Sequence, residues 1–417
     1  MLTEINFDGI VGPTHNYAGL SLGNFAATAH AGEVSRPREA ALQGLAKMRL
    51  VVQLGLAQGI FLPQPRPNQR FLNAIAADEH SDPALVAMAW SASSMWTANA
   101  ATISPAPDTA DKRCHITPAN LITMCHRFQE WQDTIRQLTL AFADQGHFVH
   151  HRPVMPCFGD EGAANHMRMT ERHYAPGIEI FVYGKAGGGF PVRQHEQACH
   201  VTARKHALDP ARVLFVEQNP EAIAAGAFHN DVVAVSNENV LLVHERAFAD
   251  PDAAYAAIRD MLPNAIIIVV PESEVSLAEA VSSYLFNGQL VTLPGPDAGM
   301  ALVVPTEASA SAAAGKWLDR LVAGNGPIRE VIPVDLRQSM ANGGGPACVR
   351  LRVVADPAAV DPRFMLDKAK ADLIEDIVKK YWPEQIDPAD LGSDDLADAV
   401  IAARDRLLDA LDLAELA

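Results

Sequence analysis

Six short runs rich in β-branched and aromatic residues constrain the fold of this chain most. They lie between helical stretches and cover residues 178–184, 213–218, 231–245, 264–271, 300–305 and 349–354. Runs of this length and composition are typical of strands. In the third run, Ser236-Asn237-Glu238-Asn239 separates two apolar halves and predicts a hairpin turn. Strands, hairpins and helices together indicate an α/β or α+β domain, and the pattern alone leaves open a doubly wound sheet or a more symmetric arrangement.

Three helical regions complete this pattern. The stretch after Ser35 has Pro37 near its start and Gly55 after its last apolar turn, so we expect a helix with Ser35 at its cap. A second helix is predicted over residues 120–144, where apolar residues recur mostly every three or four positions. The tail, residues 361–417, is predicted to be mainly helical.

Charge and hydropathy exclude two classes of partner. The 33 Lys and Arg against 50 Asp and Glu give a formal charge of −17, which argues against a nucleic-acid partner. No run of 18 uncharged apolar residues occurs, so we predict no membrane-spanning helix, and MLTEINFDGI lacks the features of a secretion signal. The odd, sparse set of cysteines predicts reduced thiols in the cytoplasm, most of them small buried hydrophobes: Cys114, Cys125, Cys157, Cys199 and Cys348.

Cys348 stands in the most distinctive local feature, the segment SMANGGGPACVRLRVV at 339–354. Three glycines and a proline turn the backbone tightly before an apolar strand and allow a ligand to approach closely. A thiol so placed can face an open site with backbone N–H groups nearby. A buried structural cysteine after an ordinary turn is the alternative, and the segment by itself does not choose between them.

His229 and Asp231 lie two residues apart in GAFHNDVVAVSN, at 226–237. On an extended chain they point to the same face, where an imidazole and a carboxylate can serve proton transfer and cation recognition together. The alternative is a turn capped by Asn230-Asp231, with an exposed histidine.

Asp160 and Glu161 are adjacent acids between glycines in CFGDEGAANHMRM, at 157–169. If this loop is buried, a carboxylate there needs a cationic partner to stay ionised, and a guanidinium substrate could be that partner. The alternative is a pair of acids at the start of a short helix.

The segment FDGIVGPTHNYAGLSLGN, at 7–24, is dense in Gly, Asn, Ser and Thr. It predicts either a ligand-facing loop with many hydrogen-bond donors or a solvated surface loop. The Cys-His dipeptides that begin at 114, 125 and 199 lack C-x-x-C or H-E-x-x-H spacing, and no phosphate-binding loop is found. We therefore expect no metal and no cofactor.

Taken in order, the long motifs of this chain resemble one family, the N-succinylarginine dihydrolases. They cover nearly the whole chain: NFDGIVGPTHNYAGLS, SSMWTANAATISP, CHR, GDEGAANH, FVYG, FHNDVVAVSN, SYLFNGQL and SMANGGGPACVRLRVV. The resemblance implies a pentein fold, an α/β-propeller of five ββαβ-type units around a pseudo-fivefold axis, with the active site in the central channel. It makes residues 1–417 a single pentein catalytic domain, with a helical C-terminal segment (361–417) that carries no motif. The segment Gly184–Phe190 looks short beside some relatives, which bears only on the rim of the pocket.

The resemblance also assigns site residues. The nucleophilic cysteine of the family falls on Cys348, its catalytic histidine on His229 and its catalytic glutamate on Glu161. Its substrate-binding positions fall on Ala18, Gly19, Leu20, Ser21, Leu22, Gly23, Asn24, Phe25, Ala26, Ala27, Asn99, His126, Arg127, Arg193, Asp231 and Asn342.

The activity implied is conversion of N2-succinyl-L-arginine and two waters to N2-succinyl-L-ornithine, two ammonia and CO2, through a covalent Cys-amidino intermediate, in the succinyltransferase route of arginine catabolism. A thiolate suits the guanidinium carbon, which is a poor electrophile, because it is a soft and strong nucleophile. Carboxylates such as Glu161 and Asp231 can fix the N–H groups. Arg127 and Arg193 can hold the substrate carboxylates in a planar grip.

Two alternatives stay open. One is a deiminase or amidinotransferase of the same fold; a deiminase would release one ammonia and a citrulline derivative. The other is a non-catalytic binding protein on the same scaffold, whose mark would be loss of the Cys, His or Glu. The resemblance further suggests a cytoplasmic homodimer with a small-molecule substrate and with no nucleic-acid or membrane partner.

Overall fold

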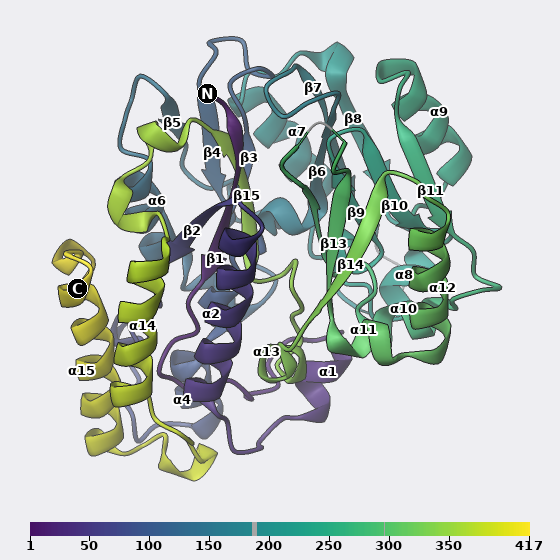
Figure 1. The fold of residues 1–417 in the computed structure, drawn as a ribbon. Coiled ribbons are helices and arrows are strands. Elements are labelled where there is room, and N and C mark those ends of the chain that lie inside the picture. The colour runs from purple at the N-terminus through teal and green to yellow at the C-terminus, as the bar shows by residue number, and fades with distance from the viewer. Residues whose placement is uncertain (186–189, 296) are drawn as a thin grey trace.

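The computed structural model describes residues 1–185, 190–295 and 297–417, so the prediction about the length of Gly184–Phe190 falls mostly outside the described residues. Within them, fifteen strands form five three-stranded sheets, with helices on the outside (Figure 1). The sheets are β15 (Arg350–Ala355), β1 (Thr3–Gly9) and β2 (Ala57–Phe61); β3 (Ala101–Ser104), β4 (Cys114–Pro118) and β5 (Phe148–His150); β6 (His166–Thr170), β7 (Gly177–Tyr183) and β8 (Val213–Glu217); β9 (Ala234–Asn237), β10 (Val240–His244) and β11 (Ile266–Val270); and β12 (Gln289–Thr292), β13 (Met300–Pro305) and β14 (Ile328–Val334).

Each sheet repeats one topology. Its middle strand pairs antiparallel with the first strand and parallel with the third. A parallel pair needs a crossover connection, and helices supply it in every unit. In chain order these are α2 (Pro37–Gln53), α5 (Cys125–Phe128) with α6 (Trp131–Ala141), α7 (Glu196–Lys205), α9 (Pro251–Met261), and α11 (Thr306–Ala310) with α12 (Ala312–Ala323). The remaining helices are α1 (Phe25–Ala29), α3 (Gln69–Ala74), α4 (Pro83–Trp90), α8 (Pro220–Ala224), α10 (Leu277–Ser283), α13 (Arg337–Ala341), α14 (Lys368–Tyr381) and α15 (Asp394–Ala410).

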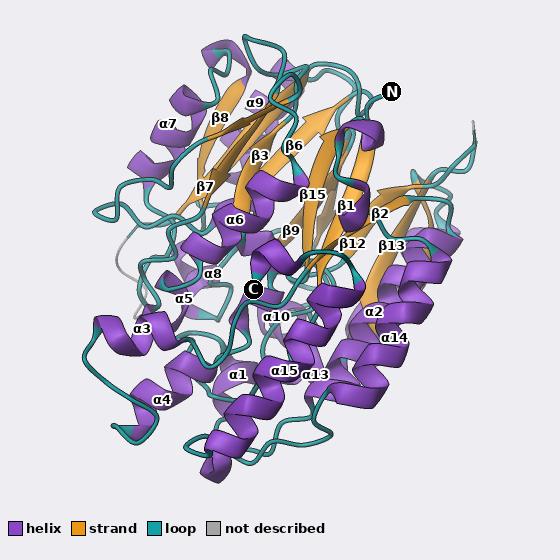
Figure 2. Cartoon of the chain, turned by 90° about the vertical axis from the view of Figure 1, so that its left-hand side faces the viewer, coloured by secondary structure: helices purple, strands orange, loops and turns teal. Residues whose placement is uncertain are grey.

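The two ends of the sheet-forming chain meet in one sheet. Strand β15 pairs with β1 from Thr3↔Ala355 to Asp8↔Arg350, so it supplies the first strand of a unit whose other strands come from the N-terminus. The first strands of the units adjoin one another, β15 with β3, β6 with β9, and β9 with β12. Four of them, β15, β3, β6 and β9, line a central cavity of about 100 Å³. Five ββαβ-type units with adjoining first strands confirm the predicted pentein fold. Figure 2 shows the strands gathered together with helices on either side of them.

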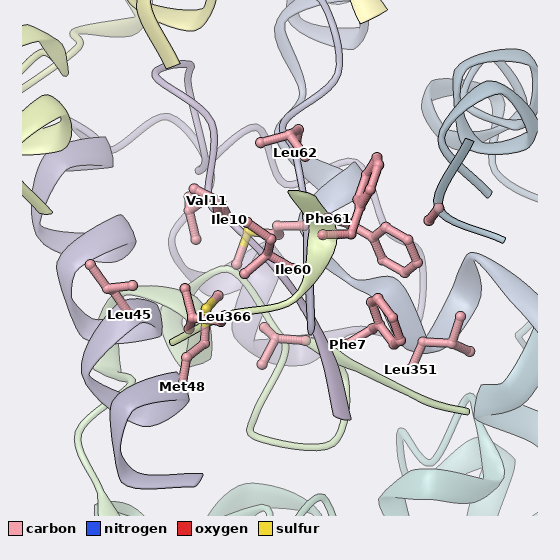
Figure 3. Close-up of a cluster of buried hydrophobic side chains, with 14 of the residues drawn as sticks. Phe7, Ile10, Val11, Leu45, Met48, Ile60, Phe61, Leu62, Leu351 and Leu366 are labelled. Atoms are coloured by element: carbon pink, nitrogen blue, oxygen red, sulfur yellow. The ribbon is translucent and has the colours of Figure 1, made fainter. Parts of the chain in front are cut away.

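The largest apolar cluster packs the closing sheet against its crossover helix. Phe7 of β1 stacks on Phe61 and meets Phe142 edge-on, each at 5.1 Å between ring centroids. Figure 3 shows Leu45 and Met48 of α2 in the same cluster. Helix α14 packs on α2, and α15 packs on α14, which confirms the predicted helical tail (Figure 1).

All six predicted strand runs are strands, and the predicted hairpin joins β9 to β10. Two helix predictions are wrong in detail. Ser35 does not cap α2: its backbone pairs with Ile386, and Arg36 stands at the cap without a side-chain hydrogen bond. Residues 120–144 do not form one helix, because Leu121 adopts a left-handed conformation (φ 50°) and the buried Gln129 and Glu130, bound to other segments, separate α5 from α6.

Candidate active site

One position is used in every unit of the ring. A polar or thiol side chain stands a few residues before the first strand of each: Asn99 before β3, Glu161 before β6, Asp231 before β9, Asn287 before β12 and Cys348 before β15. Because the first strands surround the axis, these five segments come together at one end of the ring. Hydrogen bonds join Asn99 to Glu161, and join Asn287 and Asp231 to Cys348. The Ala98 N–H, next to Asn99, donates to the Cys348 carbonyl at 3.1 Å and so connects the two groups.

His229 and Glu161 form a buried pair. Nε2 of His229 lies 2.9 Å from Oε2 of Glu161, and the two residues are 2% and 0% exposed. Glu161 precedes the short 3-10 turn Gly162–Asn165 but makes no cap with its side chain. The Gly162 N–H instead points to Oδ1 of Asp160 at 3.4 Å. Of the two adjacent acids, Asp160 thus accepts a hydrogen bond from the turn, and the side chain of Glu161 remains available to the site.

Burial decides the protonation of this pair. It lowers the pKa of His229 to about 4, so the imidazole is neutral near neutral pH and its Nε2–H donates to Glu161. Burial acts to raise the pKa of Glu161, but the hydrogen bond from His229 and the charges of Arg193 and Arg127 hold it below its ordinary value. Among the described residues, Nδ1 of His229 and Oε1 of Glu161 have no hydrogen-bond partner. A free base and a free acceptor therefore remain in the site.

The sulfur of Cys348 has two polar neighbours. Nδ2 of Asn287 donates to it at 3.1 Å, and the thiol in turn reaches Oδ2 of Asp231 at 3.6 Å. Burial, and then the neighbouring Asp231, raise the pKa of Cys348 well above its ordinary value. Burial also raises the pKa of Asp231 to about 7. Without a ligand, the group is therefore a thiol that donates to a carboxylate.

The backbone that brings His229 and Asp231 into the site differs from the predicted one. Both side chains were expected on one face of an extended segment, but Asn230–Val232 form a 3-10 turn. Across this turn, His229 reaches Glu161 and Asp231 reaches Cys348. The predicted extended geometry of this segment is therefore wrong, and the two side chains reach different partners. The alternative of an exposed histidine is also wrong, since His229 is buried.

Two buried guanidinium groups lie beside this cluster. Arg193 donates to the Leu22 carbonyl at 2.6 Å and stacks on the Phe228 ring at 4.4 Å, and no described carboxylate pairs with it. Burial lowers its pKa to about 10, and the charge of Glu161 opposes this.

Arg127 makes more hydrogen bonds within the protein than Arg193 does. It donates to Oδ1 of Asn99 at 2.9 Å and to Glu130 at 3.4 Å, while the Asn99 amide donates to the Glu161 carbonyl at 2.7 Å. Arg193 is therefore the stronger candidate for an external carboxylate.

The predicted loop 18–27 covers one side of the cluster. Asn24 caps α1 by accepting from Ala27 N–H at 3.0 Å and donates to the Gly343 carbonyl at 2.8 Å. Ser21 contacts Nε2 of the buried His126 at 3.4 Å. The side chains of Leu22 and Phe25 are 62% and 52% exposed, and the Leu22 carbonyl accepts a hydrogen bond from Arg193. Asn342, also buried, adjoins the glycine that receives Asn24.

The cysteines other than Cys348 divide into two kinds. Cys114 and Cys199 are buried, as predicted, and burial raises their pKa, that of Cys199 to about 12. Cys125 and Cys157 are exposed, so the prediction of small buried hydrophobes is wrong for these two, which lie on surface segments. In the part of the chain that the structure describes, no group of three or more His, Cys, Asp or Glu residues is placed to hold a metal. Nor does that part contain a helix long and apolar enough to cross a membrane.

Sequence reasoning missed two residues of the site. Asn287 lies in SYLFNGQL, a segment that was singled out without a role for any of its residues. Gln194 accepts from the Glu161 N–H at 2.7 Å and donates to Asp160 at 3.1 Å, which fixes the loop of both acids. Nothing in its sequence neighbourhood marks Gln194, whereas the Asn-Gly pair at 287–288, just before a β-branched run, was a visible signal.

Comparison with known proteins gives one consistent result. The model of the succinylarginine dihydrolase family matches residues 1–417. N-succinylarginine dihydrolases from Novosphingobium aromaticivorans and Sphingopyxis alaskensis are 66% and 61% identical, with 100% of each chain covered. Among solved structures, the N-terminal domain of ArgZ, an arginine dihydrolase from cyanobacteria, superposes with a TM-score of 0.52 at 14% identity, over 85% of this chain and 99% of that one. At this identity the likeness to ArgZ supports the fold alone.

Proposed function

This chain belongs to the succinylarginine dihydrolase family, and from that premise we propose that it hydrolyses N-succinylarginine with Cys348 as nucleophile, His229 as acid and base, and Glu161 as partner of both His229 and the substrate. One observation carries the proposal. Two carboxylates with unpartnered oxygens among the described residues, Glu161 and Asp231, accompany a buried thiol and a guanidinium without a described carboxylate partner, Arg193. Such a set is complementary to a ligand that carries a guanidinium at one end and carboxylates at the other.

The substrate itself prepares the nucleophile. A guanidinium that binds Asp231 and Glu161 neutralises the carboxylate that raises the pKa of Cys348, so the thiolate becomes accessible once the ligand is bound. The two carboxylates hold the flat cation while the sulfur attacks its carbon. Arg193, with help from Arg127, binds a carboxylate of the succinylated amino acid.

The reaction then runs through two hydrolytic steps. Attack by the Cys348 thiolate gives a tetrahedral adduct; proton transfer through His229 releases the first ammonia and leaves an amidino thioether on sulfur. A water deprotonated by His229 adds to that carbon, and loss of the second ammonia leaves a thiocarbamate. A second water cleaves the carbon–sulfur bond, which restores the thiol and releases a carbamate that loses CO2. The balance is two waters consumed for N-succinylornithine, two ammonia and CO2.

We test the proposal by counting products. Purified protein and N-succinylarginine should yield two ammonia and one CO2 per N-succinylornithine, and Cys348→Ser should lose nearly all activity yet still bind substrate. A ratio of one ammonia with a citrulline derivative would instead identify a deiminase. If Cys348→Ser keeps a tenth of wild-type activity, covalent catalysis at that sulfur is wrong.

The setting of the enzyme is part of the same proposal. Residues 1–417 act as a single catalytic domain, to which α14 and α15 belong because α14 packs on the crossover helix of the closing sheet and α15 packs on α14. The protein works in the cytoplasm, as its unpaired cysteines favour, and as a homodimer, as its family resemblance suggests. Light scattering of the purified protein tests the dimer, and fractionation of its native cells tests the location.

A further inference from the structure

We propose that Asn287 is the positioning residue of the nucleophile: its side-chain amide orients the sulfur of Cys348 and supplies the hydrogen bond that stabilises the thiolate. The inference rests on the proposed role of Cys348. Neither the sequence motifs nor the family resemblance gives Asn287 a function.

Asn287 holds Cys348 at two atoms. Its Oδ1 accepts from the Cys348 N–H at 3.3 Å, and its Nδ2 donates to the sulfur at 3.1 Å. Its backbone carbonyl accepts from the Ala347 N–H at 3.1 Å. Because Oδ1 is taken by a backbone donor, the NH2 end of the amide must face the sulfur. Asn287 is fully buried, so this orientation is not exchanged with solvent.

The glycine segment before β15 and the end of α10 make room for the side-chain amide of Asn287. A Cβ on Gly345 would lie 2.8 Å from Oδ1 of Asn287, so the third glycine of the Cys348 segment is what lets the amide approach. On the other side, Tyr284 ends α10 in a left-handed conformation (φ 56°) and turns the chain toward the site. Asn287 also occupies, in the fifth unit, the position that Asn99, Glu161, Asp231 and Cys348 occupy in the other four. The ring thus contributes a site residue from each unit.

The two polar neighbours of the sulfur act in opposite directions. Asp231 raises the pKa of Cys348, whereas the hydrogen bond from Asn287 lowers it. Once a guanidinium occupies Asp231, the amide of Asn287 remains as a neutral donor to sulfur, together with the backbone of Gly345. A hydrogen bond to an ionised acceptor is about twice as strong as one to a neutral acceptor, so Asn287 favours thiolate over thiol. Sulfur becomes anionic twice in a turnover, when it attacks and when the final carbon–sulfur bond breaks.

Alkylation kinetics test the inference without relying on turnover. Full-length protein is treated with iodoacetamide over a range of pH, and labelling of Cys348 is followed by mass spectrometry against the exposed Cys125 and Cys157 in the same molecule. In Asn287→Ala we expect labelling of Cys348 at fixed pH to slow by about tenfold, the effect of about one pKa unit, with the two reference cysteines unchanged. In Asn287→Asp, which keeps an oxygen for the Cys348 N–H but lacks the donor, labelling should slow at least as much.

Gln289→Ala is the matched control. Gln289 is equally buried, lies two residues away and donates to Asn6 at 2.7 Å rather than to the sulfur, so its loss should leave Cys348 labelling unchanged. In steady state, the Asn287 variants should lower kcat with KM unchanged and shift the rising limb of the pH–rate profile to higher pH. Labelling at or above the wild-type rate in both Asn287 variants overturns the inference. If Asn287→Ala does not fold, the isosteric Asn287→Asp decides alone.

The Asn287 variants and the Cys348→Ser variant test two different claims, so failure of one can be told from failure of the other. An active Cys348→Ser enzyme would refute the nucleophile whatever the Asn287 variants do. Slow labelling in the Asn287 variants together with an inactive Cys348→Ser enzyme supports both.

Discussion

Asp231 is a site residue whose burial opposes the stability of the ligand-free protein. Its carboxylate is held in the interior beside Cys348, where one oxygen has no partner among the described residues and burial raises its pKa to about 7. A buried charge without a cation destabilises a fold, and a bound guanidinium would remove that cost. The ligand-free enzyme is thus less stable than a variant without this buried carboxylate would be, as is common for sites that bind a charged ligand.

Replacing this carboxylate should stabilise the free protein in a pH-dependent way. The folded-state pKa of Asp231 is raised from 3.8 to about 7, so its contribution is full below about pH 4 and is lost as the pH rises through 7. Asp231→Asn has no charge to bury and should gain on the order of 2–4 kcal/mol over wild type at pH 8. The gain should be much smaller at pH 5. Urea unfolding at the two pH values measures it.

His229 does not disturb this comparison. Its folded-state pKa is lowered from 6.5 to about 4, so its contribution is present above pH 6.5 and is lost as the pH falls toward 4, equally in both proteins. Asp319→Asn, at an exposed helix position, controls for the loss of one negative charge. An equal gain for Asp231→Asn at pH 5 and pH 8 would mean that burial does not raise the pKa of Asp231.

At this scale, the sequence identified the reacting residues only through long motifs. Cys348, His229 and Glu161 each had a structural explanation as good as the catalytic one. Asn287 was missed because an asparagine in a loop is common, and its meaning depends on a sulfur 61 residues away. Contacts between distant segments are set by the ring, which local patterns do not encode.

Among the elements, α1 and the glycine segment before β15 are tied together. Gly343 has φ 97°, and a Cβ there would overlap the side-chain amide of Asn24, the residue that caps α1. The glycine therefore serves two purposes, a left-handed backbone and close contact with the predicted substrate loop.

Comparing Gly343→Ala with Gly32→Ala should separate the cost of a left-handed backbone from the cost of losing the contact with Asn24. Gly32 also has positive φ (80°), but its added Cβ would meet nothing within 4 Å. The left-handed strain alone costs roughly 1–2 kcal/mol, and overpacking adds roughly 1–3 kcal/mol at Gly343. Urea unfolding should show the larger loss for Gly343→Ala, which should also raise KM. Equal losses and an unchanged KM would show that the Asn24 contact is unimportant.

Strands could be predicted where a run is uniformly apolar, and could not be predicted where pairing with neighbouring strands determines the structure. The run at 266–270 is uniformly apolar and could be recognised. Strand β5 has three residues and β3 has four, too few to show a period of two. Strand β14 contains Pro333 and mixes exposed with buried residues, so its role follows from pairing with β13. Short strands such as these are specified by their neighbours.

For the whole molecule, closure of the ring depends on the β1–β15 pair. Loss of β1 would expose β15 and the middle of the apolar cluster around Phe7. Deletion of residues 1–9 should therefore abolish folding, since the loss exceeds the ~5–15 kcal/mol by which proteins are stable. Deletion of residues 1–2, which precede β1, should be tolerated. Circular dichroism and size-exclusion chromatography check both; a folded, monodisperse protein without residues 1–9 would show that the ring holds when open.

The same pairing has a consequence for the nascent chain on the ribosome. Strand β1 is synthesised well before its antiparallel partner β15, which follows it by roughly 340 residues along the chain. At the usual 5–20 residues per second, β1 waits on the order of 20–70 s before β15 emerges. Throughout that interval the apolar strand β1 lacks one hydrogen-bonded neighbour. A chaperone that binds β1 would therefore raise the yield of folded protein, and slow codons between the two strands would lower it by lengthening the wait.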